Sequence, residues 1–169
     1  MLRAALAALI LAASAPAHAE APAPAACAAP EFHQWDFWLG SWRVTDPDGV
    51  FQGTNEITRP PSGCGLLERW TSANGAPGAS FNAYDPVRKT WTQLWAGAGS
   101  VIRLEGKLDS KGAMRMQGTI AYYVGGPERA FRGVWTPLPD GSVRQAFFER
   151  DPKTRAWSNW FTGLYRRAP

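Results

Sequence analysis

The chain contains few of the residues from which metal and nucleophilic sites are usually built. Its 169 residues include two histidines and two cysteines, and His18 lies in the N-terminal segment, which leaves His33 for the rest of the chain. A zinc site with several histidine or cysteine ligands is excluded if the cysteines are bridged. Haem ligation by His33 stays an alternative, but a histidine at the start of a domain is more often a surface or capping residue. We therefore expect no metal and no cofactor.

Several catalytic motifs are also missing. The chain has no Gly-x-Ser-x-Gly elbow and no Cys-x-x-Cys pair, and the glycine-rich segment at 97–99 joins two expected strands without opening a helix. A serine triad, a redox dithiol and a phosphate loop thus find no support. Glycoside chemistry would need two converging acids, for which Glu68 with Glu105 or Glu149 is the conceivable set, and no spacing favours it.

Charge is low and carries no strong sign. Charged residues make up 19% of the chain and the formal net charge is +4, with the basic residues scattered along the sequence. Because no basic stripe forms, nucleic acid is not an expected partner. Nine tryptophans, eight phenylalanines and four tyrosines supply much apolar surface, which excludes an intrinsically disordered chain.

The one long apolar run stands at the N-terminus. Arg3 precedes the run at 4–13, and Ala17-His18-Ala19 follows with a small residue on either side of a variable one. This pattern predicts a signal peptide over residues 1–19 and export to the periplasm or beyond the cell. The run is too short to span a bilayer, so we expect no transmembrane segment. Lipid attachment at Cys27 is an alternative, but the preceding residues lack the usual leucine.

The mature chain is expected to be one domain with a single disulfide. Residues 20–31 are mostly alanine and proline and predict a flexible leader, followed by a domain over 32–169. Cys27 and Cys64 are an even pair in an exported chain, which favours a structural disulfide between them.

The spacing of strand and turn signals along the domain is typical of an all-β protein. Phe32, Trp35, Phe37, Trp38 and Leu39 crowd into eight positions before Gly40, which favours a short helical turn. Turn signals such as those at 46–49, 74–75 and 139–141 then separate short β-branched and aromatic runs. The expected strands are 41–46, 50–58, 65–73, 79–85, 89–96, 100–108, 113–124, 129–136, 142–150 and 156–166. Consecutive hairpins of this kind predict an antiparallel up-and-down β-barrel of about ten strands, because closure removes the exposed edges; a β-sandwich is the alternative.

A short motif after the helical turn carries a resemblance. Residues 37–42 read Phe-Trp-Leu-Gly-Ser-Trp, and this Gly-x-Trp resembles the start of lipocalin-like (calycin) barrels. The segments at 35–38, 63–70, 84–85 and 91–95 together are similar to an uncharacterised family of exported bacterial proteins of that kind. The resemblance implies a barrel closed at one end, with Trp42 packed against an arginine of the last strand, for which Arg166 is the best match. Such barrels include ligand carriers, haem proteins and some enzymes.

Strand alternation then selects a candidate ligand site. Trp91, Gln93 and Trp95 share one face of a strand, and Leu66, Glu68 and Trp70 share one face of another. A carboxylate between apolar neighbours needs a partner, which Arg144 or Arg103 would supply. The predicted ligand-binding residues are Glu68, Trp70, Trp91, Gln93, Trp95 and Arg144.

The sequence predicts a protein that binds a small apolar or amphipathic molecule in an aromatic-lined barrel lumen. Two alternatives stay open: a barrel-shaped enzyme acting on a small metabolite, in which Glu68 would be the first acid-base candidate, and a structural or interaction module with a filled core. Asn82, Gln117 and Gln145 also fall within expected strands, and we expect each to face solvent. No catalytic residue and no oligomeric state are predicted.

Overall fold

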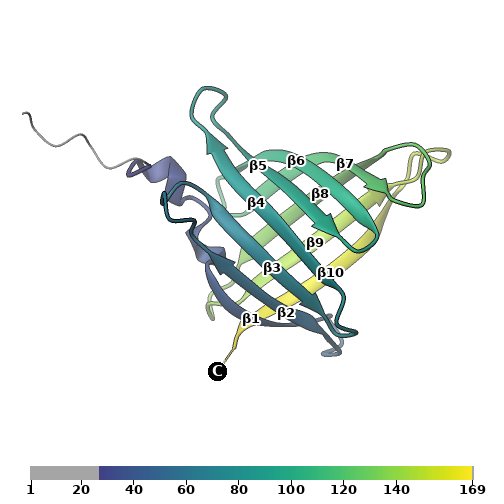
Figure 1. Cartoon of the computed structure of the whole chain (residues 1–169), viewed down its shortest axis with the longest axis horizontal. Coiled ribbons are helices and arrows are strands. Elements are labelled where there is room, and N and C mark those ends of the chain that lie inside the picture. Colours follow the sequence, from purple (N-terminus) through teal and green to yellow (C-terminus); the bar gives the residue numbers. More distant parts are fainter. Residues whose placement is uncertain (1–26, 169) are drawn as a thin grey trace, which may run out of the picture.

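The computed structural model describes residues 27–168, which form two short 3₁₀ turns and a closed antiparallel barrel of ten strands (Figure 1). The signal peptide predicted over residues 1–19 and most of the predicted leader lie outside this range. The elements are η1 (Pro30–His33), η2 (Asp36–Trp38), β1 (Gly40–Thr45), β2 (Phe51–Thr58), β3 (Leu66–Ser72), β4 (Pro77–Asp85), β5 (Thr90–Gly97), β6 (Ser100–Leu108), β7 (Met114–Tyr122), β8 (Arg129–Pro137), β9 (Val143–Arg150) and β10 (Trp157–Arg167).

The barrel closes between its first and last strands. Each strand pairs with its sequence neighbour, and β1 pairs with β10 from Trp42 opposite Arg167 to Thr45 opposite Leu164. Closure leaves neither strand as a free edge, which is the physical reason that a meander of this length forms a tube. The predicted fold class is confirmed, and the ten expected strands match the observed ones to within two residues at each end.

The two 3₁₀ turns close one end of the barrel with aromatic rings. Trp35 and Trp38 are fully buried and stack on each other with centroids 5.2 Å apart. Trp135 and Trp91 meet Trp35 edge-on, at 4.9 and 5.6 Å. Because large aromatic rings in such edge and stacked contacts bury much apolar area, this end of the barrel is a packed core.

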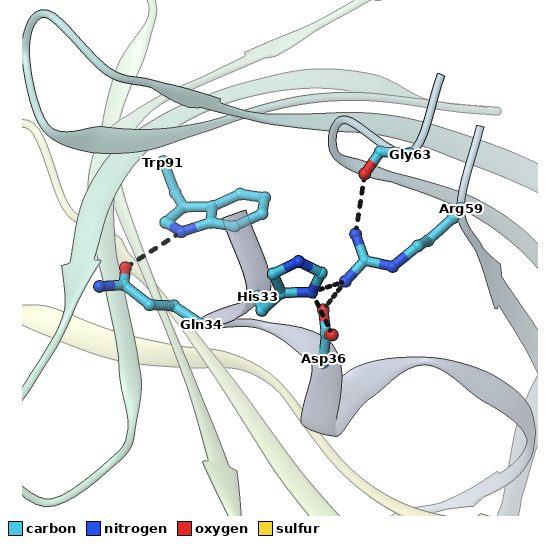
Figure 2. Close-up of polar contacts among 6 residues, drawn as sticks. All are labelled: His33, Gln34, Asp36, Arg59, Gly63 and Trp91. Carbon is cyan, nitrogen blue, oxygen red and sulfur yellow. Dashed lines mark hydrogen bonds and ion pairs between the residues drawn. The ribbon is translucent and has the colours of Figure 1, made fainter. Parts of the chain in front are cut away.

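A disulfide and an ion pair fasten these turns to the β2–β3 loop. Cys27 is bonded to Cys64, as predicted from their even count. Figure 2 shows the Arg59 guanidinium of the same loop donating to the Asp36 carboxylate and to the Gly63 carbonyl, with His33 beside them. Two independent links therefore hold the closed end in place. No helix within residues 27–168 is long and apolar enough to cross a membrane.

The Gly-x-Trp motif lies where the barrel closes, but its arginine partner is Arg167. The Arg167 guanidinium lies 4.0 Å from the centre of the Trp42 ring and donates to the Leu39 carbonyl. The register pairs Trp42 with Arg167, whereas Arg166 is paired with Arg43 and therefore points to the opposite face of the strand. The motif's glycine is favoured here, because Gly40 has a φ of 124°, a backbone conformation that residues with a Cβ rarely adopt.

Candidate functional site

A cavity of about 130 Å³ lies inside the barrel, on the side of the core away from the 3₁₀ turns. Its wall combines polar side chains and aromatic rings from β3, β5, β9 and β10 with one isoleucine from β6. The lining residues are Glu68, Trp70, Gln93, Trp95, Ile102, Gln145, Phe147, Trp160, Phe161 and Tyr165.

Glu68 is the charged side chain of this cavity and is 4% exposed. Strand pairing places Ser80 of β4 directly opposite it, and Ser80 Oγ donates to Glu68 Oε2 at 2.6 Å. Asn55 of β2 donates from Nδ2 to Glu68 Oε1 at 2.7 Å. The predicted need of Glu68 for a partner is thus met by two neutral groups, and neither Arg144 nor Arg103 reaches it: Arg103 pairs with Glu128 on the outer face.

The polar contacts continue around the barrel interior. Asn82 Nδ2 donates to Ser80 Oγ at 2.8 Å, and Gln93 Nε2 approaches the same oxygen at 3.5 Å. Tyr165 donates its hydroxyl proton to Gln145 Oε1. The result is a buried polar belt across neighbouring strands, and such networks fix side-chain positions only when their members are bonded.

Burial changes the acidity of two groups in this belt. Loss of solvation raises the pKa of Glu68 to about 7, and the hydrogen bonds from Ser80 and Asn55 oppose that rise. Burial also raises the pKa of Tyr165 well above its ordinary value, and the nearby Glu68 charge adds to the effect. Near neutral pH, Glu68 therefore exchanges between a neutral acid and a carboxylate, while Tyr165 keeps its proton.

Aromatic side chains cover the outer side of the cavity. The alternation of β10 is broken by an irregularity between Asn159 and Phe161. As a result two successive rings turn inward: Trp160 packs edge-on against Phe131 at 5.4 Å, and Phe161 packs against Trp70 at 6.3 Å. Trp160 remains 42% exposed, so it lies between the cavity and solvent.

A polar cluster at the same end holds Trp160 in place. Its indole Nε1 donates to the Tyr122 hydroxyl at 3.0 Å, and that hydroxyl donates to the Glu149 carboxylate. Arg129 bonds the second oxygen of Glu149 at 2.6 Å. Burial, followed by the bond to Glu149, raises the pKa of Tyr122, and the bond to Glu149 raises that of Arg129. Tyr122 and Arg129 therefore both keep their protons through the physiological range.

Four of the six predicted ligand-binding residues meet at the cavity: Glu68, Trp70, Gln93 and Trp95. Trp91 points inward as expected but lies in the closed end, where its Nε1 donates to the Gln34 side chain at 3.3 Å (Figure 2). A strand advances about 3.3 Å per residue, so Trp91 and Trp95 are roughly 13 Å apart along β5, too far to share so small a cavity. Arg144 is exposed, because its neighbour Gln145 faces the interior.

Several lining residues were not predicted as ligand-binding from the sequence: Ile102, Gln145, Phe147, Trp160, Phe161 and Tyr165. Two expected solvent-facing residues, Asn82 and Gln145, are buried, whereas Gln117 is exposed as expected. The inward direction of Gln145 and Phe147 could have been predicted from sequence, since both lie on the same face of the strand as Val143. The inward direction of Trp160 could not, because the irregularity in β10 depends on the pairing of β10 with β9.

A broader depression of about 1020 Å³ lies on the outer face, mainly over β4 to β8. Its walls include outward side chains such as Leu94 and Arg103, which are exposed. Since buried polar groups do not converge there, the interior cavity is the better candidate. No group of three histidine, cysteine, aspartate or glutamate residues in the described part of the chain could hold a metal ion.

No family model and no curated protein matches this chain.

Proposed function

We propose that this protein is an exported, lipocalin-like binding protein that holds one small, largely apolar molecule inside its barrel. The observation that carries the proposal is the interior cavity itself, which has a polar belt around Glu68 on one side and aromatic rings on the other. A mostly apolar wall with a few placed polar groups is the usual composition of a small-molecule site.

Cavity size limits the ligand. Drug-sized sites occupy roughly 300 to 1,000 Å³, whereas an apolar cavity of roughly 150 Å³ in another protein holds benzene. The present cavity has about 130 Å³, which fits a molecule built on a single ring. A long acyl chain or a haem would need displacement of Trp70, Trp95 or Trp160.

Export is part of the proposal and has two supports. The predicted signal peptide over residues 1–19 directs the chain out of the cytoplasm. The Cys27–Cys64 disulfide fits an oxidising compartment, where such bonds persist. Periplasmic or secreted protein would therefore meet small molecules outside the cytoplasm.

The experiment is a titration of the mature protein with benzyl alcohol, followed by tryptophan emission and by thermal stability. We expect a saturable change, because Trp70, Trp95 and Trp160 surround the cavity. Ile102→Phe fills the cavity from β6 and should abolish saturation, whereas Leu94→Phe, on the outer face of β5, should not. An interior packed solid with side chains would give no saturable change in any of the three proteins, and the binding proposal would then be rejected.

A further inference from the structure

We infer that the molecule bound in this cavity is a compact organic cation, a protonated amine carried on a single ring or a short apolar body. This inference rests on the proposed function and adds the chemical class of the ligand.

The first support is a buried carboxylate without a cation. Six other acids in residues 27–168 each contact an arginine: Asp36, Glu56, Glu105, Asp109, Glu128 and Glu149. Glu68 is more deeply buried than any of these acids, and its partners are the amide of Asn55 and the hydroxyl of Ser80. A buried carboxylate that meets only neutral groups is an incomplete ion pair, which a cationic ligand would complete.

The second support is the direction of the free hydrogen-bonding capacity. A carboxylate has about four acceptor positions, and each Glu68 oxygen accepts one bond from the protein. Gln93 also lines the cavity, and its buried Oε1 has no partner among the described residues. The Tyr165 hydroxyl already gives its proton to Gln145. Beside the carboxylate, the free capacity of Glu68 and Gln93 is therefore that of acceptors, which a ligand carrying N–H donors would use.

The third support is the aromatic wall. Trp70, Trp95, Trp160 and Phe161 line the same cavity as Glu68. A cation within about 6 Å of such ring faces is attracted by their quadrupoles, most strongly by tryptophan when solvent is excluded. An ammonium group has three donors and no acceptor, so it matches the Glu68 oxygens and Gln93 Oε1 at once. An anion would meet a carboxylate and unpaired acceptors, and a neutral ligand would leave the carboxylate without a counter-charge.

Binding of such a cation is coupled to the protonation of Glu68. The side chains around it are Asn55 on β2, Ser80 on β4 with Asn82 bonded to it, Gln93 on β5, Gln145 on β9 and Tyr165 on β10. The amides and Ser80 do not titrate, and burial raises the pKa of Tyr165 well above its ordinary value. Since the pKa of Glu68 is about 7, the cation must displace a proton at lower pH. Its affinity should fall about tenfold per pH unit below 7 and level off above.

The experiment compares benzylamine, benzyl alcohol and benzoate by calorimetry at pH 8, using the mature, disulfide-bonded protein. We expect benzylamine to bind at least tenfold more tightly than benzyl alcohol, and benzoate more weakly than either. Glu68→Gln should weaken benzylamine about thirtyfold or more and benzyl alcohol less than threefold, because only the amine loses a buried charge partner. Glu56→Gln removes an exposed carboxylate from the neighbouring strand and should change neither affinity.

Each remaining outcome has a definite meaning. If benzyl alcohol binds as tightly as benzylamine, the cation inference fails and the lumen-binding proposal stands. If none of the three compounds binds, both fail. If Glu68→Gln leaves benzylamine affinity unchanged, the amine sits elsewhere and the inference is rejected. Should that variant not fold, the wild-type protein decides: benzylamine affinity must fall between pH 8 and pH 5 while benzyl alcohol affinity stays level.

Discussion

Glu68 is buried between neutral donors on the two neighbouring strands, and this placement has a thermodynamic consequence beyond ligand binding. Its pKa in the folded protein is about 7, against 4.5 for the ordinary carboxyl. Between these values the folded state binds more protons than the unfolded state, so stability falls as pH rises from about 4.5 and becomes level above about 7. A shift of this size corresponds to roughly 3 kcal/mol.

We therefore predict that the free energy of unfolding of Glu68→Gln increases relative to that of the wild type as pH rises. The neutral amide removes the cost of burying a charge, so the difference in unfolding free energy between variant and wild type should move by up to about 3 kcal/mol from pH 4.5 to pH 8. Urea unfolding at the two pH values measures it. Glu56→Gln on the exposed face of β2 is the control, with a change below about 1 kcal/mol. A Glu68 variant equally affected at both pH values would contradict the raised pKa.

A second residue-scale prediction concerns the arginine that covers Trp42. Arg167 lies over the ring and donates to the Leu39 carbonyl, whereas its neighbour Arg166 is paired with Arg43 on the other face of the strand. Arg167→Ala should lower the free energy of unfolding by about 1 kcal/mol, and Arg166→Ala by less than about 0.5 kcal/mol. Thermal unfolding of both variants measures the difference. Equal effects would mean that the contact with Trp42 contributes nothing to stability.

The alternation of side chains along a strand explains which residues of the site could be predicted from the sequence. Glu68 with Trp70, and Gln93 with Trp95, share faces because side chains in a strand repeat with period two, and this holds whatever the partner strand is. Alternation does not tell how far along a strand a side chain lies. Trp91 therefore shares a face of β5 with Trp95 but does not line the cavity. On β9 the shared face of Val143, Gln145 and Phe147 indicates the inward side, but Arg144 was selected as a partner for Glu68, so Arg144 and Gln145 were assigned the wrong way round.

At the scale of elements, the strands were predictable because turns and alternation are local. Asp-containing turns such as Asp109, whose carboxylate accepts from the Lys111 and Ala113 amides, can be recognised from sequence alone. The irregularity in β10 was not, since it exists only in the register between two strands. Its effect is to bring Trp160 to the mouth of the cavity, where regular alternation would place Asn159.

We predict that Trp160 controls ligand exchange. Trp160→Ala removes the ring over Phe131 and the hydrogen bond to Tyr122, opening the outer side of the cavity. The dissociation rate of benzyl alcohol should rise about tenfold, since losing one such aromatic contact costs about 1 to 2 kcal/mol. Stopped-flow tryptophan emission measures the rate. Trp157 is on the same strand as Trp160, but its exposed ring packs under Arg132 on the outer face, so Trp157→Ala should leave the dissociation rate unchanged. An equal acceleration in both variants would refute a specific role of Trp160.

At the scale of the molecule, the nine tryptophans divide by position. Trp35, Trp38, Trp42, Trp91 and Trp135 are fully buried in the closed end, Trp70, Trp95 and Trp160 line the cavity, and Trp157 is on the outer face. The sequence left two hypotheses open, a filled core and a hollow lumen. The closed end of the barrel is filled, and the other end contains the cavity. Composition alone could not separate them, because the division depends on how far along each strand an indole lies.

This division predicts that the closed end can be loosened without losing the cavity. Replacing Cys27 and Cys64 together by serine removes a crosslink between residues 37 positions apart, which the loop-entropy relation values at about 4 kcal/mol of stability. The paired rings of Trp35 and Trp38 stay buried, so the barrel should still fold, with a lower melting temperature and a benzyl alcohol affinity within threefold of the wild type. Calorimetry of the folded variant measures both, and dithiothreitol should destabilise the wild type alone. A folded variant with affinity reduced more than tenfold would show that the tethered turns shape the cavity from the far end of the barrel.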